Sequence, residues 1–510
     1  MSETSSNNKR IARNTLFLYI RMMLMMVVSL YTSRVVLNTL GITDYGIHNV
    51  VGGLVSMFSL ISGSMNTTIS RYLTFELGRG DVERLKVVFS TSVNIQIGIA
   101  VFIVLLAEVV GLWFLNYKMV IPEERMVAAN WVYQCALLSF CINIISVPFN
   151  AVIIAHEKMD SYAYFGILEV LLKLLIVFLL LFSSWDRLIY YSILLLAVSL
   201  FMRVLYGWYC NKYFKESKYY FVFEKSVLKE MGSFAGWNYF GAIAAILRTQ
   251  GLNVLLNLFF GVTVNAARGV ATQVEAAVTQ FVANFTMALN PQITKSFAKG
   301  DREYMHKLVC YGAKYSYFMM LILIIPIIIE APIILKLWLK IVPDYTVIFL
   351  RITLIVILLD TLSDTLTMSM QASGDIKLYQ IVVGSIELSI FPISYFLFKV
   401  GMPPFSCYIV CAAAMVVKLI VKLPILHKSI GLPPSQFISI VIVKVVPVSV
   451  LLFSVPLAFA FFIEDSIFRF IIVTVVSFLW SVPVIFYMGL SITERQLLLN
   501  KAKAMLLNKK

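Results

Sequence analysis

The sequence has few charged side chains for its length. Of its 510 residues, 14% are Asp, Glu, Lys or Arg, whereas 60% are hydrophobic. Water-soluble globular chains carry roughly a quarter charged residues, so this composition excludes a soluble globular protein. Apolar runs of about 20 residues recur, which is long enough to cross a hydrocarbon core of ~30 Å. The short alternating segments of a transmembrane barrel are missing. We therefore predict an all-α polytopic membrane protein.

Side chains that carry catalysis or bind metals are also scarce. The chain has four histidines and six cysteines, with no CxxC pair and no Cys/His cluster. The cysteines lie in apolar segments, where we expect them to act as small hydrophobic side chains. The sequence contains no Walker loop, nucleophile elbow or HExxH motif. We accordingly expect no enzyme activity, no catalytic residue, no metal, no cofactor and no direct use of ATP.

The excess of basic residues follows a topological pattern. The net charge is +15, and Lys and Arg collect in every second loop, for example at residues 79–86, 211–230 and 295–307. By the positive-inside rule these loops are cytoplasmic, and so are both termini. The charge therefore indicates topology and not nucleic-acid binding. No small-residue cleavage site follows the N-terminal apolar segment, so the first membrane helix is expected to direct insertion.

About 14 membrane spans are expected from the apolar runs. Their approximate ranges are 16–39, 46–72, 88–114, 127–154, 161–183, 188–210, 233–260, 265–290, 309–335, 346–370, 379–399, 406–426, 438–462 and 467–490. A long basic and aromatic loop follows the sixth span, as a linker between two six-helix lobes would. We predict lobes at residues 1–210 and 233–426, a linker at 211–232, and two extra helices with a cytoplasmic tail at 427–510.

An internal repeat supports the two lobes, because residues 41–83 recur at 261–303 without a gap. Most identical residues lie at the segment ends, where turn chemistry selects the residue. They pair Gly41 with Gly261, Thr43 with Thr263, Thr74 with Thr294, Gly80 with Gly300, Asp81 with Asp301 and Glu83 with Glu303. Both copies begin at the outer end of an odd-numbered span. We therefore expect a parallel repeat, related by an axis along the membrane normal.

The repeated helix carries a polar face. Helical spacing aligns His48, Gly52, Ser56, Ser59, Gly63, Asn66 and Ser70 in one copy, and Arg268, Thr272, Ala276, Thr279, Ala283, Thr286 and Asn290 in the other. Small residues of this kind suit a tight seam between helices. They suit the wall of a polar cavity equally well. The basic residues at the head of each stripe favour the cavity.

Other basic and amide side chains lie within the predicted spans, where ionisable groups are costly and usually face a bundle interior. They are Arg21, Arg34, Asn38, Arg248 and Asn253. Arg21 and Arg34 lie near span ends and can alternatively extend to the lipid headgroups, whereas Arg248 lies near the middle of its span. With His48 and Arg268 these residues predict a basic cavity lining. Such a lining favours an anionic ligand, and guanidinium groups suit paired phosphates especially well.

Acidic side chains are fewer within the spans. Asp360 and Asp364 lie one turn apart, Glu387 is single, and Glu169 lies one turn from Lys173, where an ion pair within the helix is expected. A buried carboxylate can hold a proton at neutral pH, so these acids are candidates for ion coupling. The sequence does not choose among them. Lys418, Lys422 and Lys444 lie near inner helix ends and are expected to extend to the headgroups.

Two stretches, TSRVVLNTLGITDYGIHNVVGG at 32–53 and SVPFNAVIIAHEKMDSYAYFGILEVLLKL at 146–174, carry a family resemblance. There the chain resembles the Wzx-type polysaccharide flippases of the multidrug/oligosaccharidyl-lipid/polysaccharide exporter superfamily. The resemblance implies a helical bundle with a central cavity that opens alternately to each side of a bacterial inner membrane. The implied cargo is a polyprenyl diphosphate-linked oligosaccharide, such as an O-antigen repeat unit. The implied partners are membrane lipids and other polysaccharide assembly proteins, and the one cavity residue within a matching motif is Arg34.

Other functions compete with this one. A multidrug exporter of the same superfamily usually relies on acidic groups in its first lobe, whereas the first span here has two arginines and no carboxylate. A peptidoglycan-precursor flippase would also carry a lipid diphosphate. A membrane glycan polymerase or ligase needs a sizeable outer loop, and the predicted outer loops are short.

Overall fold

The computed structural model describes residues 3–56, 58–117, 119, 121–182, 185–339, 342–496 and 499. These residues form helices and connecting loops, and none of them forms a strand. Contacts within the chain define two compact units, Met1–Ala242 with Thr294–Gly300, and Ile243–Ile293 with Asp301–Lys510. The lobe boundaries proposed from the sequence remain a prediction.

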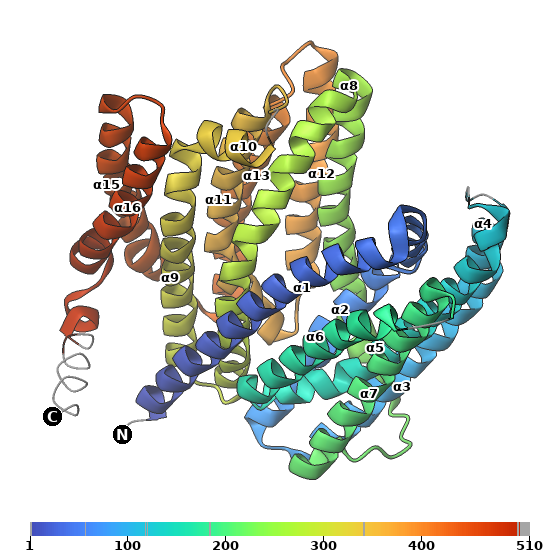
Figure 1. The fold of residues 1–510 in the computed structure, drawn as a ribbon. Helices are drawn as coiled ribbons and strands as arrows, with labels where there is room; N and C mark the ends of the chain where they lie inside the picture. The colour runs from blue at the N-terminus through green and yellow to red at the C-terminus, as the bar shows by residue number, and fades with distance from the viewer. Residues whose placement is uncertain are drawn as a thin grey trace, which may run out of the picture. The chain divides into compact units, whose positions relative to one another are not determined.

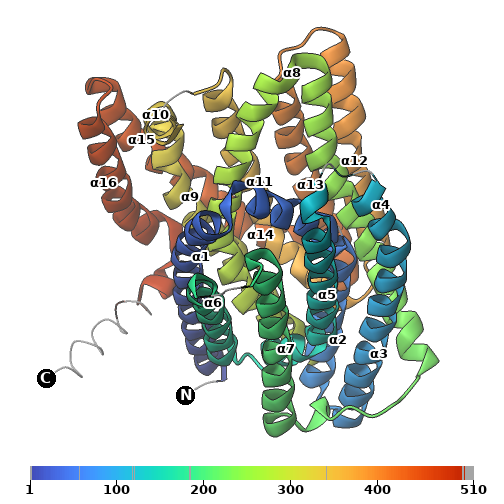
Figure 2. The same ribbon diagram turned by 45° about the vertical axis from the view of Figure 1, so that its right-hand side comes forward.

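Unit 1 is a bundle in which α5 is central. In Figure 2 the helices α2, α3, α5 and α7 stand side by side, and α1 packs against α5 and α6. In chain order its elements are α1 (Glu3–Ser56), α2 (Ser59–Arg79), α3 (Val82–Leu106), η1 (Ala107–Gly111), α4 (Leu112–Tyr117), η2 (Glu123–Arg125), α5 (Met126–Ala155), α6 (Met159–Leu181), α7 (Arg187–Tyr213), η3 (Lys215–Ser217) and the beginning of α8 (Lys225–Ala298).

Unit 2 continues α8 and adds the helices that follow it. Helix α11 packs between α9 and α13, and α12 packs against α13 (Figure 1). The elements are α9 (Arg302–Ile329), α10 (Ala331–Leu339), α11 (Thr346–Ser373), α12 (Lys377–Lys399), α13 (Ser406–Ile430), α14 (Pro434–Phe437), η4 (Ile438–Ile442), α15 (Val443–Phe462), α16 (Ile467–Val484) and η5 (Ile485–Gly489).

Twelve helices of the described chain are long and apolar enough to cross a membrane. They correspond to all the expected spans except 46–72 and 265–290, which are largely helical within α1, α2 and α8 but are not among the twelve. Those two segments carry the polar stripes of the repeat, and their serine, threonine, asparagine and glycine residues lower the local hydropathy. The chain is thus a multi-pass helical membrane protein, and the two further spans remain a prediction.

Two glycines interrupt the longest helices. Gly41 in α1 has φ 82° and ψ 169°, and Gly261 in α8 has φ 79° and ψ −174°. This backbone region is essentially restricted to glycine. Each glycine therefore ends one helix and starts another, so α1 and α8 each consist of two helices.

We expect Gly41→Ala and Gly261→Ala each to destabilise the protein by about 1–3 kcal/mol, since alanine would be strained at this φ. A new Cβ would meet no atom within 4 Å at either position, so the effect isolates backbone strain. Gly46→Ala and Gly269→Ala are matched controls, because both glycines are helical and equally uncrowded. These controls should be neutral or slightly stabilising. Thermal unfolding of the detergent-solubilised variants measures the difference, and equal midpoints for all four would contradict the assigned strain.

The loops that follow the polar stripes also have similar local geometry. Gly80 and Gly300 both adopt a left-handed conformation, with φ 80° and 78°. Asp81 and Asp301 then cap the next helices, accepting hydrogen bonds from the backbone N–H of Arg84 (2.9 Å) and Tyr304 (3.1 Å). A left-handed glycine followed by an acidic N-cap is a standard way to stop one helix and start another.

Two charged clusters connect helix ends within unit 1. Arg125 forms ion pairs with Asp44 and Asp186, both at 2.5 Å. Burial acts to raise the pKa of Asp186, but hydrogen bonds from Arg125 and from the backbone of Ile189 and Leu188 outweigh it and hold the pKa below its ordinary value.

The second cluster surrounds Glu157, whose side chain has no exposed surface. Its carboxylate pairs with Arg10 at 2.7 Å and with Lys295 at 2.6 Å. Lys295 belongs to the short stretch Thr294–Gly300 that joins unit 1 from the end of α8. A buried carboxylate is costly unless it is paired, so these two cations are needed to hold Glu157 there.

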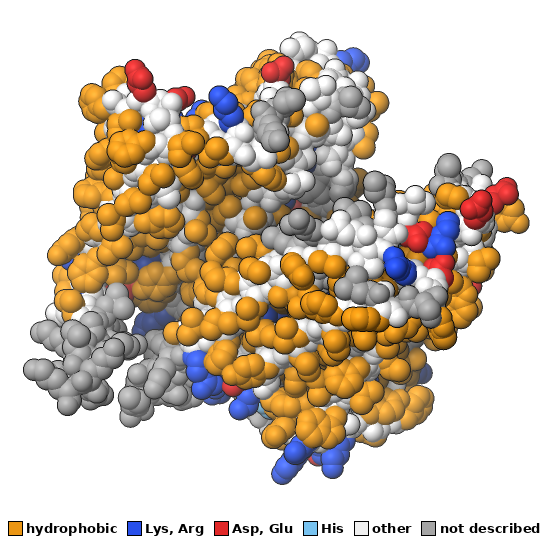
Figure 3. All heavy atoms as spheres, viewed as in Figure 1, with side chains coloured by type: hydrophobic (Ala, Val, Ile, Leu, Met, Phe, Trp, Pro, Cys, Tyr) orange, Lys and Arg blue, Asp and Glu red, His pale blue; other side chains and the backbone are white. Residues whose placement is uncertain are grey.

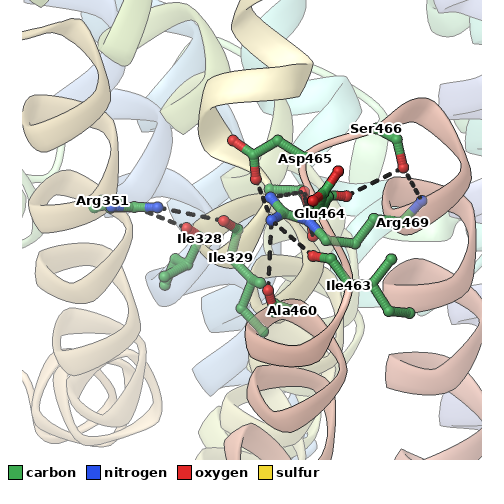
Figure 4. A network of polar contacts seen from close by, with 10 residues as sticks. Ile328, Ile329, Arg351, Ala460, Ile463, Glu464, Asp465, Ser466 and Arg469 are labelled. Atoms are coloured by element: carbon green, nitrogen blue, oxygen red, sulfur yellow. Dashed lines mark hydrogen bonds and ion pairs between the residues drawn. The ribbon is translucent and has the colours of Figure 1, made fainter.

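In unit 2 the hairpin of α15 and α16 is joined to the end of α9 by a buried ion pair. Arg469 donates to Glu330, with an Nη2–Oε2 distance of 3.0 Å, and the Glu330 side chain is fully buried. The same guanidinium donates to the carbonyls of Ala460 and Ile463 near the end of α15 (Figure 4). Arg469 therefore links the end of α9 to both helices of the hairpin.

Candidate functional site

Arg268 lies at the centre of a polar cluster in unit 2. The side chain is buried, and its Nη2 donates to the carbonyl of Thr249 at 2.8 Å. Its Nε donates to the side-chain oxygen of Asn253, and its Nη1 to the hydroxyl of Tyr408 at 3.4 Å. In a continuous helix Asn253 and Arg268 would stand about 22 Å apart. The break at Gly261 reverses the chain and brings these two predicted site residues into contact.

A small cavity of about 30 Å³ adjoins this cluster, roughly the room that one water needs. Its lining comes from α8, α11 and α13 and comprises Arg248, Thr249, Leu252, Arg268, Glu275, Thr353, Val356, Tyr408 and Cys411. Two arginines face one carboxylate, so the lining carries a net positive charge. The buried Nε of Arg248 donates to no acceptor in the described chain.

Beside Arg248 lies a second set of charges, contributed by α11, α12 and α13. Lys418 pairs with Asp360 at 2.6 Å and with Glu387 at 3.0 Å, and its side chain is 5% exposed. These two carboxylates also act electrostatically on Arg248. Asp364 follows Asp360 by one helical turn on α11. The structure thus brings three of the four predicted coupling acids into one region.

The neighbouring lysine is buried as well. Lys422 donates to the hydroxyl of Thr367 at 3.0 Å, and Thr367 is hydrogen-bonded to the hydroxyl of Tyr379 at 2.7 Å. The expectation that Lys418 and Lys422 extend to the headgroups is therefore wrong. Carboxylates and hydroxyls on the adjacent helices satisfy both ammonium groups inside the protein. The sequence spacing could have indicated these contacts. Lys418 and Lys422 lie one helical turn apart, and so do Asp360 and Asp364 on another span.

Among the side chains that the structure describes, the predicted site residues of unit 1 do not form a comparable cluster. Arg21 stacks over the ring of Tyr162 at 4.3 Å, and Gly166 leaves the space that its guanidinium occupies. His48 packs edge-to-face against Tyr191 at 5.0 Å. Asn38 is exposed. No hydrogen bond or ion pair among the described residues connects Arg21, His48 and Asn38.

Glu169 and Arg34 are the remaining predicted site residues of unit 1. Glu169 pairs with Lys173 at 2.6 Å within α6, as the spacing predicts, and both side chains are partly exposed. The side chain of Arg34 lies outside the described side chains.

The fold resembles that of known membrane transporters. A multidrug resistance MATE family transporter of the MOP superfamily, in an outward-facing conformation, matches with a TM-score of 0.71 and 13% identity, over 83% of this chain and 96% of that chain. MATE in the straight conformation matches with a TM-score of 0.70 and 14% identity, over 83% and 96%.

A third structure differs in its described pocket. It is a MOP superfamily transporter from Pyrococcus furiosus, described as having a binding pocket of reverse polarity that suggests a different function. It matches with a TM-score of 0.69 and 13% identity, over 83% of this chain and 96% of that chain. No protein-family model matches the sequence, and no curated protein matches it. The chain therefore has the fold of the MATE transporters of the MOP superfamily.

Proposed function

We propose that the chain is a flippase that moves an anionic lipid, a polyprenyl diphosphate-linked oligosaccharide, from the inner to the outer leaflet by alternating access. The observation that carries this proposal is the lining of the unit 2 cavity. Arg248 and Arg268 face a single carboxylate there, and the Arg248 Nε has no acceptor in the described chain. A guanidinium with a free donor suits a phosphate oxygen. The family resemblance of the sequence supports the same function.

The proposed architecture has two six-helix lobes in a parallel repeat, about 14 spans, and both termini in the cytoplasm of a bacterial cell. Two local similarities support the repeat. Gly41 and Gly261 have nearly the same backbone conformation, and Asp81 and Asp301 cap helices after left-handed glycines. The loops rich in Lys and Arg support the orientation.

Ion coupling is proposed for the carboxylates beside Arg248. Asp360 and Glu387 both form ion pairs with Lys418. A proton or cation that neutralises one of these carboxylates therefore changes the electrostatic interactions of the other carboxylate and of the lysine. Asp364 lies one turn away on the same helix. Glu169 is a weaker candidate, because Lys173 already balances its charge.

A multidrug exporter is the second candidate function, and the fold comparison favours it, since one similar structure is a multidrug resistance transporter. Deletion of the gene separates the two candidates. We expect a lipid-linked oligosaccharide to accumulate on the cytoplasmic side and surface glycan to fall, with drug susceptibility unchanged. Normal surface glycan together with increased drug susceptibility would establish the multidrug function instead. Accumulation of peptidoglycan precursor alone would assign the cargo to cell-wall synthesis.

A further inference from the structure

An apolar groove runs along α3 in unit 1. Its volume is about 360 Å³, within the range of ~300–1,000 Å³ typical of small-molecule sites. Apolar residues dominate its lining: Ile95, Gly98, Ile99 and Phe102 on α3, with Phe223 and Leu228 opposite. The lining on α3 begins at Thr91 and ends at Phe102, a rise of about 16 Å. An apolar lining of this length suits a hydrocarbon chain.

The wall opposite α3 is held in place by specific hydrogen bonds. Asn94 donates to the carbonyl of Val222 at 2.8 Å and accepts from the hydroxyl of Tyr219 at 2.8 Å. The backbone N–H of Tyr220 donates to the hydroxyl of Ser90 at 3.4 Å. The segment before α8 is therefore fixed against α3, although it has no regular structure. Because these bonds occupy the Asn94 amide, the groove presents mainly apolar surface to a ligand.

One end of the groove is basic. Arg84 pairs with Glu224 at 2.5 Å, which places the first residues of α3 and α8 together. Lys225 and Lys229 are exposed on the first turns of α8, on either side of the lining residue Leu228. Neither lysine forms an ion pair within the described chain, so both are available to an external anion. Lys and Arg side chains gather at the lower end of unit 1 in Figure 3.

Exposed aromatic side chains accompany these lysines. Phe221 is 81% exposed and Phe223 is 60% exposed, and Tyr219 and Tyr220 beside them are also exposed. Aromatic rings next to basic residues are typical of the boundary between headgroups and hydrocarbon. We therefore expect the basic end of the groove at headgroup depth and its apolar part within the hydrocarbon.

We propose that this groove binds an anionic phospholipid, with one acyl chain along α3 and the phosphate between Lys225 and Lys229. The apolar lining of the groove lies next to two lysines that form no ion pair in the described chain. An anionic phospholipid has a matching arrangement, with an apolar acyl chain next to a charged phosphate. Each lysine near an anionic headgroup is expected to strengthen binding roughly fivefold.

The test is native mass spectrometry of the full-length protein, released from nanodiscs that contain equal phosphatidylglycerol and phosphatidylcholine. Gly98→Leu fills the groove, and it should fold, because a Cβ at Gly98 meets nothing within 4 Å. We expect this variant to lose most of its retained phosphatidylglycerol, whereas the matched control Gly98→Ala keeps it. Unchanged retention in Gly98→Leu would overturn the site.

A second set of variants tests the proposed contact between the two lysines and the lipid phosphate. The double variant Lys225→Gln/Lys229→Gln should retain phosphatidylglycerol roughly 10- to 30-fold more weakly. The charge-matched control is Lys336→Gln/Lys399→Gln, which alters two exposed lysines of unit 2 and should have no effect. Equal retention of phosphatidylcholine and phosphatidylglycerol by the unmodified protein would overturn the anionic specificity. A dimer lost in Gly98→Leu without a change in bound lipid would assign the groove to a second copy of the chain.

Discussion

Replacing Arg248 by glutamine is expected to reduce cargo export at least tenfold while the protein remains folded in the membrane. A hydrogen bond from a charged group contributes about 1.5–3 kcal/mol, or roughly 10- to 150-fold. The Arg248 Nε donates to no acceptor in the described chain, so Arg248→Gln breaks no hydrogen bond of this atom within the protein, although it removes a cation that acts on Asp360 and Glu387. Arg248→Lys should recover only part of the activity, because lysine lacks the planar fork.

The matched comparison is with Arg268. Its three hydrogen bonds to Thr249, Asn253 and Tyr408 are internal, so Arg268→Gln should lower the amount of folded protein as well as export. Arg13→Gln changes an exposed arginine and serves as the neutral control. Export is measured as surface glycan in a deletion strain, normalised to protein in the membrane fraction. Full export by Arg248→Gln would exclude a cargo role for this side chain.

Replacing Lys418 by methionine is expected to destabilise unit 2 by about 3 kcal/mol. Removing one partner of a buried ion pair costs ~3–5 kcal/mol, because the other charge stays buried without compensation. The lower end applies here, since the Asp360 side chain is 35% exposed whereas that of Glu387 is 11% exposed. The measurement is the thermal unfolding of detergent-solubilised protein.

A second substitution tests the cause of this loss. Adding Glu387→Gln to Lys418→Met should restore part of the stability, because the most buried unpaired charge is then removed. Lys173→Met is the control, since it breaks a partly exposed pair within α6 and should change stability by less than ~1 kcal/mol. If Lys418→Met unfolds at the same temperature as the unmodified protein, the network contributes nothing to stability.

The helical class follows from the sequence, because apolar length determines it locally. Some boundaries agree within a few residues, as for Thr346–Ser373, whereas α9 begins seven residues before the predicted range 309–335. Gly41 and Gly261 are turn residues at the ends of the repeated segments, and they interrupt α1 and α8. Hydropathy alone recognises the polar-striped segments poorly, since serine and threonine lower the average without preventing a helix. The helical spacing of their polar residues marks these segments better than their mean hydropathy does.

The candidate site was only partly predictable, because contacts between helices depend on which faces meet. The sequence marks a turn at Gly261 but does not show that Arg268 comes to rest on Asn253. The expectation that Lys418 extends to the headgroups is wrong for the same reason. A lysine near a helix end suits the headgroups, and only the neighbouring Asp360 and Glu387 explain why it stays inside.

The pairing of Glu157 has a consequence for the order of assembly during synthesis. Arg10 precedes Glu157 in the chain, whereas Lys295 follows it and comes after Ile243–Ile293, the first part of unit 2. Before Lys295 is made, the Glu157 carboxylate lacks one of these two cations. Unit 1 is therefore completed by the end of α8, which is synthesised after the rest of unit 1. A chain stopped at residue 242 lacks this closing contact, and one stopped at residue 300 has it. We therefore expect unit 1 to be complete only once the chain has been made as far as residue 300.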